Sequence, residues 1–112
     1  MKDLDQLLPK EKVIDFCYQW KIDELYVFGS ILRNDFGPKS DIDLMVSFSP
    51  EAEWSLFDHV QMQSELEELL GRSVDLITRK AIESSHNWIR RNEILNTAQI
   101  YFSANEALHA TG

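Results

Sequence analysis

The sequence has little of three features that would place it in other protein classes. It contains one cysteine, Cys17, so it has neither a disulfide framework nor a zinc site built from several cysteines. Val13, Phe16 and Trp20 surround this cysteine in the sequence, and we expect it to be a small buried hydrophobe. No segment is apolar for long enough to span a membrane, and residues 1–8 lack the apolar run of a signal peptide. The cytoplasm is therefore the expected location.

Basic residues are also scarce. The chain has 11 lysines and arginines against 19 aspartates and glutamates, a formal net charge of -8. A protein that binds nucleic acid usually presents a basic face to the phosphates, so a nucleic-acid partner is disfavoured. A folded protein or a small cationic molecule suits the charge better. The acidic excess agrees with a divalent metal site, although the total charge alone is better explained by solubility.

The chain is long enough for one hydrophobic core. With 112 residues, of which 44% are hydrophobic, we expect a single domain over residues 1–112 with mobile ends at 1–8 and 103–112. A domain of this size has little room for two large substrates. Part of the site for a large acceptor would have to come from another chain.

Hydrophobic periodicity predicts alternating helices and strands. A helix over residues 52–70 is predicted from the apolar positions Leu56, Val60, Leu66 and Leu70. The other expected elements are a helix at 9–20, strands at 24–28, 41–48 and 73–78, a helical turn at 31–34, a mainly helical stretch at 80–95 and a short strand at 97–102. This order indicates an α/β or α+β domain, with a small mixed sheet flanked by helices.

Three aspartates stand out on the predicted strands. Asp41 and Asp43 are two positions apart, so both project from one face of their strand. Asp75 lies between Val74 and Leu76, where a buried carboxylate without a partner would be costly. A cation shared by the three would remove that cost, and an all-oxygen set of ligands suits Mg²⁺ or Mn²⁺. Taken alone, Asp41 and Asp43 fit a solvated strand start better.

The Gly29-Ser30 pair follows a predicted buried strand and opens a short helical segment. Glycine allows a phosphate to approach the backbone closely, and the following N–H groups point toward an anion. By itself this pair is weak evidence. It gains weight because a strand with two aspartates follows at short distance.

The pattern of Gly29-Ser30, Arg33, Ser40 to Leu44 and Val74 to Leu76 resembles the nucleotidyltransferase superfamily that includes DNA polymerase beta and kanamycin nucleotidyltransferase. The short chain is similar to the minimal branch of that superfamily. One departure is Asn34, where members commonly have glycine after the arginine. Asparagine tolerates a left-handed backbone, so the loop shape is compatible with this change.

The resemblance implies a polymerase beta-like fold and a role for each motif residue. Asp41, Asp43 and Asp75 would be the catalytic residues and would hold two Mg²⁺ ions, with Mn²⁺ as a substitute. Asp75 would also act as general base. The nucleotide, ATP, would contact residues near the Gly29-Ser30 pair and before the aspartate strand: Gly29, Ser30, Arg33 and Ser40. Arg33 is an equally good candidate for an ion pair with Asp35 or Asp41.

The resemblance also implies a biological role. Many members of the minimal branch are encoded beside a helical partner of the HEPN type and act as antitoxins, some by transferring AMP from ATP to a tyrosine of the toxin. We therefore expect AMP transfer to a hydroxyl of such a partner. Two alternatives are an antitoxin that neutralises its partner by binding alone, and a nucleotidyltransferase acting on a small molecule such as an aminoglycoside.

Several other residues have more ordinary interpretations. Trp88 and Ile89 beside Arg90 and Arg91 are candidates for a patch that docks a partner, although we favour Trp88 in the core. Trp54 is likewise a candidate for a docking patch that we instead expect in the core. Lys39 is expected to be a solvated loop residue, and the three histidines are expected at the surface or between helices because they lack the spacing of metal ligands: His59, His86 and His109.

Overall fold

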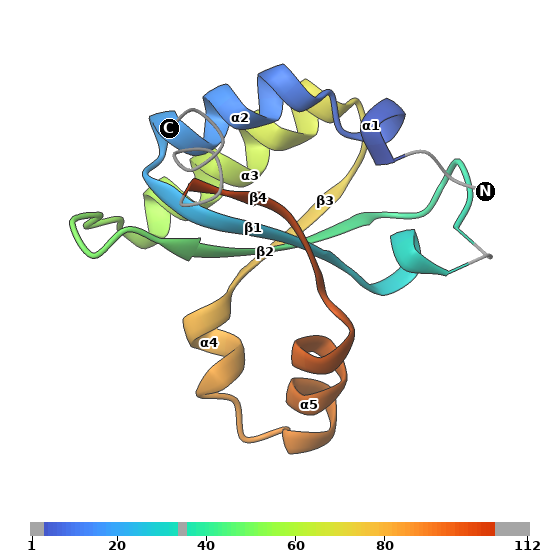
Figure 1. The fold of residues 1–112 in the computed structure, drawn as a ribbon, viewed down its shortest axis with the longest axis vertical. Coiled ribbons are helices and arrows are strands. Elements are labelled where there is room, and N and C mark those ends of the chain that lie inside the picture. The colour runs from blue at the N-terminus through green and yellow to red at the C-terminus, as the bar shows by residue number, and fades with distance from the viewer. Residues whose placement is uncertain (1–3, 34–35, 105–112) are drawn as a thin grey trace.

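The computed structural model describes residues 4–33 and 36–104 as a four-stranded sheet with helices on both faces (Figure 1). This is the mixed α+β architecture that the sequence predicts. The elements are α1 (Leu4–Leu7), α2 (Lys10–Gln19), β1 (Ile22–Phe28), the 3₁₀ helix η1 (Gly29–Leu32), β2 (Ile42–Phe48), α3 (Leu56–Leu70), β3 (Val74–Thr78), α4 (Arg79–Glu83), α5 (Trp88–Thr97) and β4 (Gln99–Ser103).

The strands lie in the order β3-β2-β1-β4. β1 is antiparallel to both of its neighbours, whereas β2 and β3 are parallel. Consequently the C-terminal end of β1 lies beside the N-terminal ends of β2 and β3. The sequence motifs that follow β1 and open β2 and β3 therefore meet at the same end of the strands.

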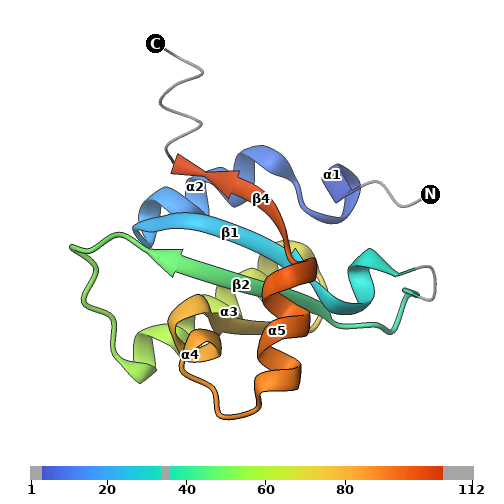
Figure 2. The ribbon, with the colours of Figure 1, turned by 60° about the horizontal axis from the view of Figure 1, so that its bottom comes forward.

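The two faces of the sheet are covered differently. Helices α2 and α3 lie over one face, and α4 and α5 lie over the other (Figures 1 and 2). Between the sheet and α2 and α3 is the main core, whose fully buried members include Val13, Cys17, Leu25, Leu44, Met62 and Leu66. On the other face Phe28, Met45, Ile82 and Ile94 form a smaller cluster.

Helix α3 begins later than predicted, at Leu56 rather than at Ala52. Ser55 caps it: its hydroxyl accepts the N–H of Asp58, and the carboxylate of Asp58 accepts the N–H of Ser55. The predicted apolar stripe is wrong at its start, since Leu56 is 78% and Val60 60% exposed. Met62 and Leu66 provide the buried side of the helix instead.

The helical stretch predicted at 80–95 is two helices. Ser84 terminates α4, and the side chain of Asn87 begins α5 by accepting the N–H of Arg90. Local capping residues therefore divide a segment for which periodicity alone predicts one mainly helical stretch.

The N-terminal segment contributes to the core from Leu4 onward. Leu8 is fully buried, and its carbonyl accepts a hydrogen bond of 2.7 Å from the hydroxyl of Tyr101. Leu8 is therefore part of the core, within the range 1–8 for which a mobile end is expected. At the other end Ser103 is buried in β4, and residues 1–3 and 105–112 lie outside the described part of the chain.

Cys17 is buried, as expected. Burial raises the pKa of its thiol to about 12, so the neutral thiol predominates at physiological pH and is a poor nucleophile. Within residues 4–33 and 36–104, no helix is long and apolar enough to cross a membrane.

Candidate active site

Three aspartates and the Gly29-Ser30 turn meet where β1 ends. Asp43 is the second residue of β2 and pairs in register with Phe28 of β1 on one side and with Asp75 of β3 on the other. Asp41 directly precedes β2. Because Asp43, Met45 and Phe28 share a face, the carboxylates of Asp43 and Asp75 belong to the face covered by α4 and α5.

Asp43 is the most enclosed of the three carboxylates. Partial burial raises its pKa, the negative charge of Asp75 raises it further, and Asp41 adds to the same effect. The backbone N–H of Ser30 donates to the Asp43 carboxylate, and together with the charge of Arg33 it opposes this rise. Asp43 therefore lies in a field that favours the gain of positive charge, from a proton or a cation.

Asp41 and Asp75 are both exposed. The cost that a buried carboxylate would have between Val74 and Leu76 therefore does not arise at Asp75, although both of those neighbours are buried. The reason is that β3 is an edge strand, and its alternate positions face different surroundings: Val74 and Leu76 face the main core, whereas Asp75 faces solvent beside Asp43. Asp43, whose carboxylate is partly buried, is the residue for which a cation would offset the cost of burial.

Gly29 is required at its position for two reasons. Its φ of 72° lies in the left-handed region that favours glycine, and a Cβ added there would overlap the carboxylate oxygen Oδ2 of Asp43. The next residue, Ser30, donates its hydroxyl to the carbonyl of Asp41 at 3.3 Å. The Gly29-Ser30 turn thus packs directly on the strand that carries the two aspartates, as its spacing in the sequence predicts.

The donor chemistry of the aspartates fits a hard divalent cation, since it consists of carboxylate oxygens and the like charges of the set raise the pKa of Asp43. The side chains do not form a complete coordination shell, however. Among the described residues, no three acidic, histidine or cysteine side chains are grouped closely enough to form a metal site.

Arg72 is a residue of this region that the sequence analysis missed. Its guanidinium donates to the carbonyls of Gly37 and Ser40, each at 3.0 Å, and lies 4.6 Å from the ring centroid of Phe36. It thereby fixes the turn before Asp41 to the start of β3. A single arginine between the helix-terminating Gly71 and a strand was the available signal, although its long-range partners were not visible in the sequence.

Ser40 also supports this turn. Its N–H donates to the carbonyl of Gly37, and its hydroxyl accepts the N–H of Gly37 at 3.0 Å. Lys39 is exposed, as expected, whereas Asn34 and Asp35 lie outside the described residues.

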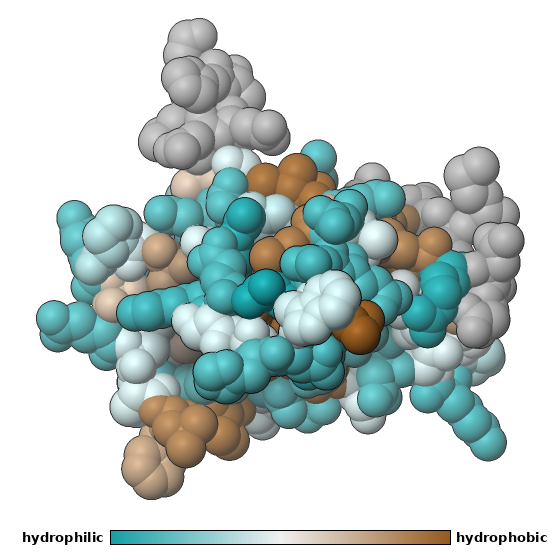
Figure 3. Space-filling view, turned by 90° about the horizontal axis from the view of Figure 1, so that it is seen from below, coloured by the Kyte–Doolittle hydropathy of each residue, from teal (hydrophilic) through white to brown (hydrophobic). Residues whose placement is uncertain are grey.

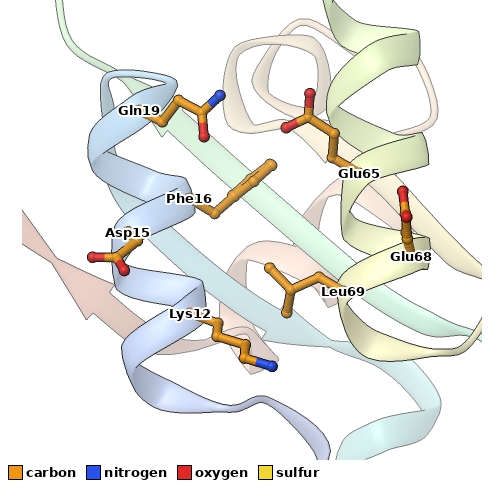
Figure 4. Close-up of a pocket in the computed structure, with 7 residues that line it drawn as sticks. All are labelled: Lys12, Asp15, Phe16, Gln19, Glu65, Glu68 and Leu69. Atoms are coloured by element: carbon orange, nitrogen blue, oxygen red, sulfur yellow. The ribbon is translucent and has the colours of Figure 1, made fainter.

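A cavity of about 440 Å³ adjoins Gly29 on the side away from Asp75. It lies between the end of β1 with η1 and the last turns of α5. Its walls are formed by Phe28, Gly29, Leu32, Arg33, Glu93, Ile94, Thr97 and Gln99. A second cavity, of about 400 Å³, lies between α2 and α3 on the opposite face, with Glu65, Glu68 and Asp15 at its rim (Figure 4). The second cavity is on the wrong face to serve the aspartates.

The sequence matches the family described as nucleotidyltransferase domain over residues 10–101. The chain belongs to this family. The family match and the geometry of the site agree, because the matched region contains the Gly29-Ser30 turn, the aspartate strand β2 and Asp75 of β3. The nucleotidyltransferase fold expected from these motifs is thus confirmed.

A relative from Methanocaldococcus jannaschii is named "Putative protein adenylyltransferase"; it is 36% identical over 89 residues, which cover 80% of this nucleotidyltransferase and 89% of the relative. A solved structure of a "putative minimal nucleotidyltransferase" is 30% identical, with a TM-score of 0.66, and the match covers 88% of this chain and 95% of that one. A crystal structure of a toxin-antitoxin with AMP-PNP matches in fold, with a TM-score of 0.67 at 19% identity, covering 89% of this chain and 77% of that one.

Among the described residues, exposed apolar side chains are grouped at the starts of α3 and α5. Trp88 and Ile89, at the start of α5, are 61% and 63% exposed, so the favoured placement of Trp88 in the core is wrong. Leu56, Phe57 and Val60 are exposed at the start of α3, and brown patches are visible on the face shown in Figure 3. Trp54, in contrast, packs edge-on against Trp20 and donates to its carbonyl.

His59 also has a structural role, because its Nε2 lies 2.8 Å from the carbonyl of Leu76. His86 is exposed, in line with the expectation, and His109 lies outside the described residues.

Proposed function

We propose that this nucleotidyltransferase is a magnesium-dependent protein adenylyltransferase that moves AMP from ATP to a hydroxyl of a protein partner. The observation that carries the proposal is the packing of Gly29-Ser30 against Asp43, with Asp75 in register beside it. The Gly29-Ser30 turn, which would bind the phosphates, thus lies next to two carboxylates of like charge. The relative named as a protein adenylyltransferase supports the choice of reaction.

The nucleotide would lie with its triphosphate over the Gly29-Ser30 turn. The absence of a side chain at Gly29 leaves the backbone open to a phosphate oxygen. Arg33 lies close enough to affect the charge state of Asp43, so phosphates beside that aspartate would also lie in the field of its guanidinium. The hydroxyl of Ser40 accepts from Gly37 and retains its own proton to donate to the nucleotide.

Asp41, Asp43 and Asp75 would hold magnesium, which neutralises charge on the attacking and leaving oxygens in phosphoryl transfer. Asp43 lies between the other two and would position the α-phosphate. Asp75, at the exposed edge of the set, would take the proton of the acceptor hydroxyl. The acceptor oxygen bonds to the α-phosphorus, the bond from that phosphorus to the bridging oxygen breaks, and pyrophosphate leaves with the electron pair.

The exposure of Asp75 favours a macromolecular acceptor. A tyrosine on the surface of a second protein can reach an edge strand without entering a closed pocket. We therefore propose a tyrosine of a HEPN-type toxin, encoded nearby, as the acceptor. A toxin-antitoxin is among the solved structures with this fold.

The direct test is transfer of label from [α-³²P]ATP with magnesium, with and without the protein encoded beside this one. We expect label on a tyrosine of the partner, and we expect its loss in Asp41→Asn and Asp43→Asn. Asp15→Asn, which removes an exposed carboxylate from α2 on the opposite face, is the matched control and should retain transfer.

Two results would count against this function. Label that persists in purified Asp43→Asn would remove the assignment of the aspartates. A stable complex that binds ATP without any label on the partner would instead indicate an antitoxin that acts by occlusion, for which the exposed Trp88 and Ile89 offer a contact surface.

A further inference from the structure

The cavity beside Gly29 has the chemistry of a nucleoside site rather than a phosphate site. We propose that it binds the base and ribose of the donor nucleotide, with Glu93 of α5 accepting hydrogen bonds from the nucleoside. This inference rests on the proposed function, because it concerns the orientation of the same donor. It assigns a substrate-binding role to α5, which carries none of the motif residues.

The floor of the cavity is apolar. Phe28 and Ile94 belong to the buried cluster on this face, and Leu32 of η1 contributes a half-buried side chain. Such a surface suits the flat, weakly polar face of a base, whereas it offers nothing to a phosphate. The volume of about 440 Å³ is in the range of small-ligand sites.

The rim of the cavity is polar and carries hydrogen-bonding groups suited to a nucleoside. Glu93 offers a carboxylate, and Gln99, the first residue of β4, offers both a donor and an acceptor. The hydroxyl of Thr97 donates to the carbonyl of Glu93 at 2.6 Å, which leaves its oxygen available as an acceptor. These groups can pair with ribose hydroxyls or with the edge of a base.

The charges at the two ends of the cavity differ, and this difference fixes the direction of the ligand. Glu93 and Thr97 lie in the C-terminal half of α5, where the helix dipole is negative and no basic residue occupies the last turn. A triphosphate would be repelled there, whereas neutral donors would be favoured. Arg33 and the Gly29-Ser30 turn stand at the other end, next to Asp43.

This direction places donor and acceptor on opposite sides of Asp43. The nucleoside lies toward β1 and β4, the α-phosphate lies at β2, and the exposed Asp75 of β3 is left open to the acceptor. The strand order therefore separates the two substrates without a second domain.

The inference can be tested by binding alone. We would measure the affinity of α,β-methylene-ATP and of inorganic triphosphate, each with magnesium, by calorimetry on the full chain. Glu93→Ala should weaken the ATP analogue about tenfold, because it removes a hydrogen bond to a charged acceptor. Inorganic triphosphate should bind equally well or better, since a nearby negative charge is gone. Glu68→Ala, which removes an exposed carboxylate from α3 on the other face (Figure 4), should change neither affinity.

A second variant tests the cavity by filling it. Thr97 is exposed, so Thr97→Trp is compatible with folding and would place a ring at the cavity mouth. We expect it to weaken the analogue at least tenfold and to spare inorganic triphosphate. Unchanged affinity for the analogue in both variants, or an equal loss for analogue and triphosphate, would overturn the inference while the proposed function stood. A wild-type chain that binds neither ligand would overturn both, and the non-transferable analogue makes these readouts independent of the acceptor.

Discussion

The two faces of the sheet have different compositions and different tasks. Under α2 and α3 the side chains are almost all apolar and fully enclosed, and the cavity there is a shallow gap between two helices. Under α4 and α5 only four residues form the buried cluster, and the same face carries the aspartates and the cavity beside Gly29. The difference indicates that stability is concentrated on one face, which allows the other to hold mutually repelling carboxylates.

The largest effect should come from the face that contributes stability. Leu66 of α3 is fully buried, and Leu66→Ala should lower the free energy of unfolding by about 2–5 kcal/mol, because it leaves a cavity in the main core. Urea titration would measure this. Leu56→Ala on the same helix is the control, since Leu56 is 78% exposed, and it should stay within about 0.5 kcal/mol of the wild type. Equal losses at the two positions would contradict the assignment of Leu66 to the main core.

A smaller effect is expected at Arg72, where the loop before Asp41 is joined to β3. Arg72→Ala removes both hydrogen bonds to the carbonyls of Gly37 and Ser40, and we expect kcat for AMP transfer to fall about tenfold. Millimolar guanidinium should restore part of kcat if Arg72 acts by positioning the loop. Arg90→Ala, at an exposed site on α5, should leave kcat unchanged. A fall in thermal stability with no fall in kcat would assign Arg72 a purely structural role.

The smallest effect has the opposite sign. The raised pKa of Asp43 means that the folded state holds its proton more tightly than the unfolded state, so stability is lost as pH rises through the folded pKa. At neutral pH the ionised carboxylate therefore destabilises the fold, and Asp43→Asn should stabilise it by a few tenths of a kcal/mol to about 1 kcal/mol. The gain in urea midpoint should disappear below the ordinary carboxyl pKa. A destabilised Asp43→Asn at neutral pH would contradict this account.

The sequence was informative where local chemistry fixes the outcome. The two-residue spacing of Asp41 and Asp43, and the Gly29-Ser30 turn after an apolar strand, led to the correct strands. The exposure of Asp75 was not predictable, because it depends on β3 being an edge strand, a property of the sheet order.

The errors at helices have a similar origin. Leu56, Val60 and Trp88 are large apolar residues typical of a core, but they are exposed. They lie before the buried residues of their helices, which begin at Met62 in α3 and at Ile94 in α5. Periodicity identifies an apolar face of a helix and does not show how much of the helix the sheet covers. The cavity beside Gly29 could not be predicted from local patterns either, because its walls come from four elements that only the fold brings together: β1, η1, α5 and β4.

The position of β4 has a consequence for the folding process. The central strand β1 gains one neighbour from β2, which follows it closely, and the other from β4, which is made after every other element described here. The hydrogen bond from Tyr101 to Leu8 spans 93 residues, so the loop it closes is long and entropically costly. Contacts of such long range slow folding. During synthesis one edge of β1 therefore stays open until the strand at 99–103 has emerged, and in that interval the nascent chain offers a template for strand addition by another molecule.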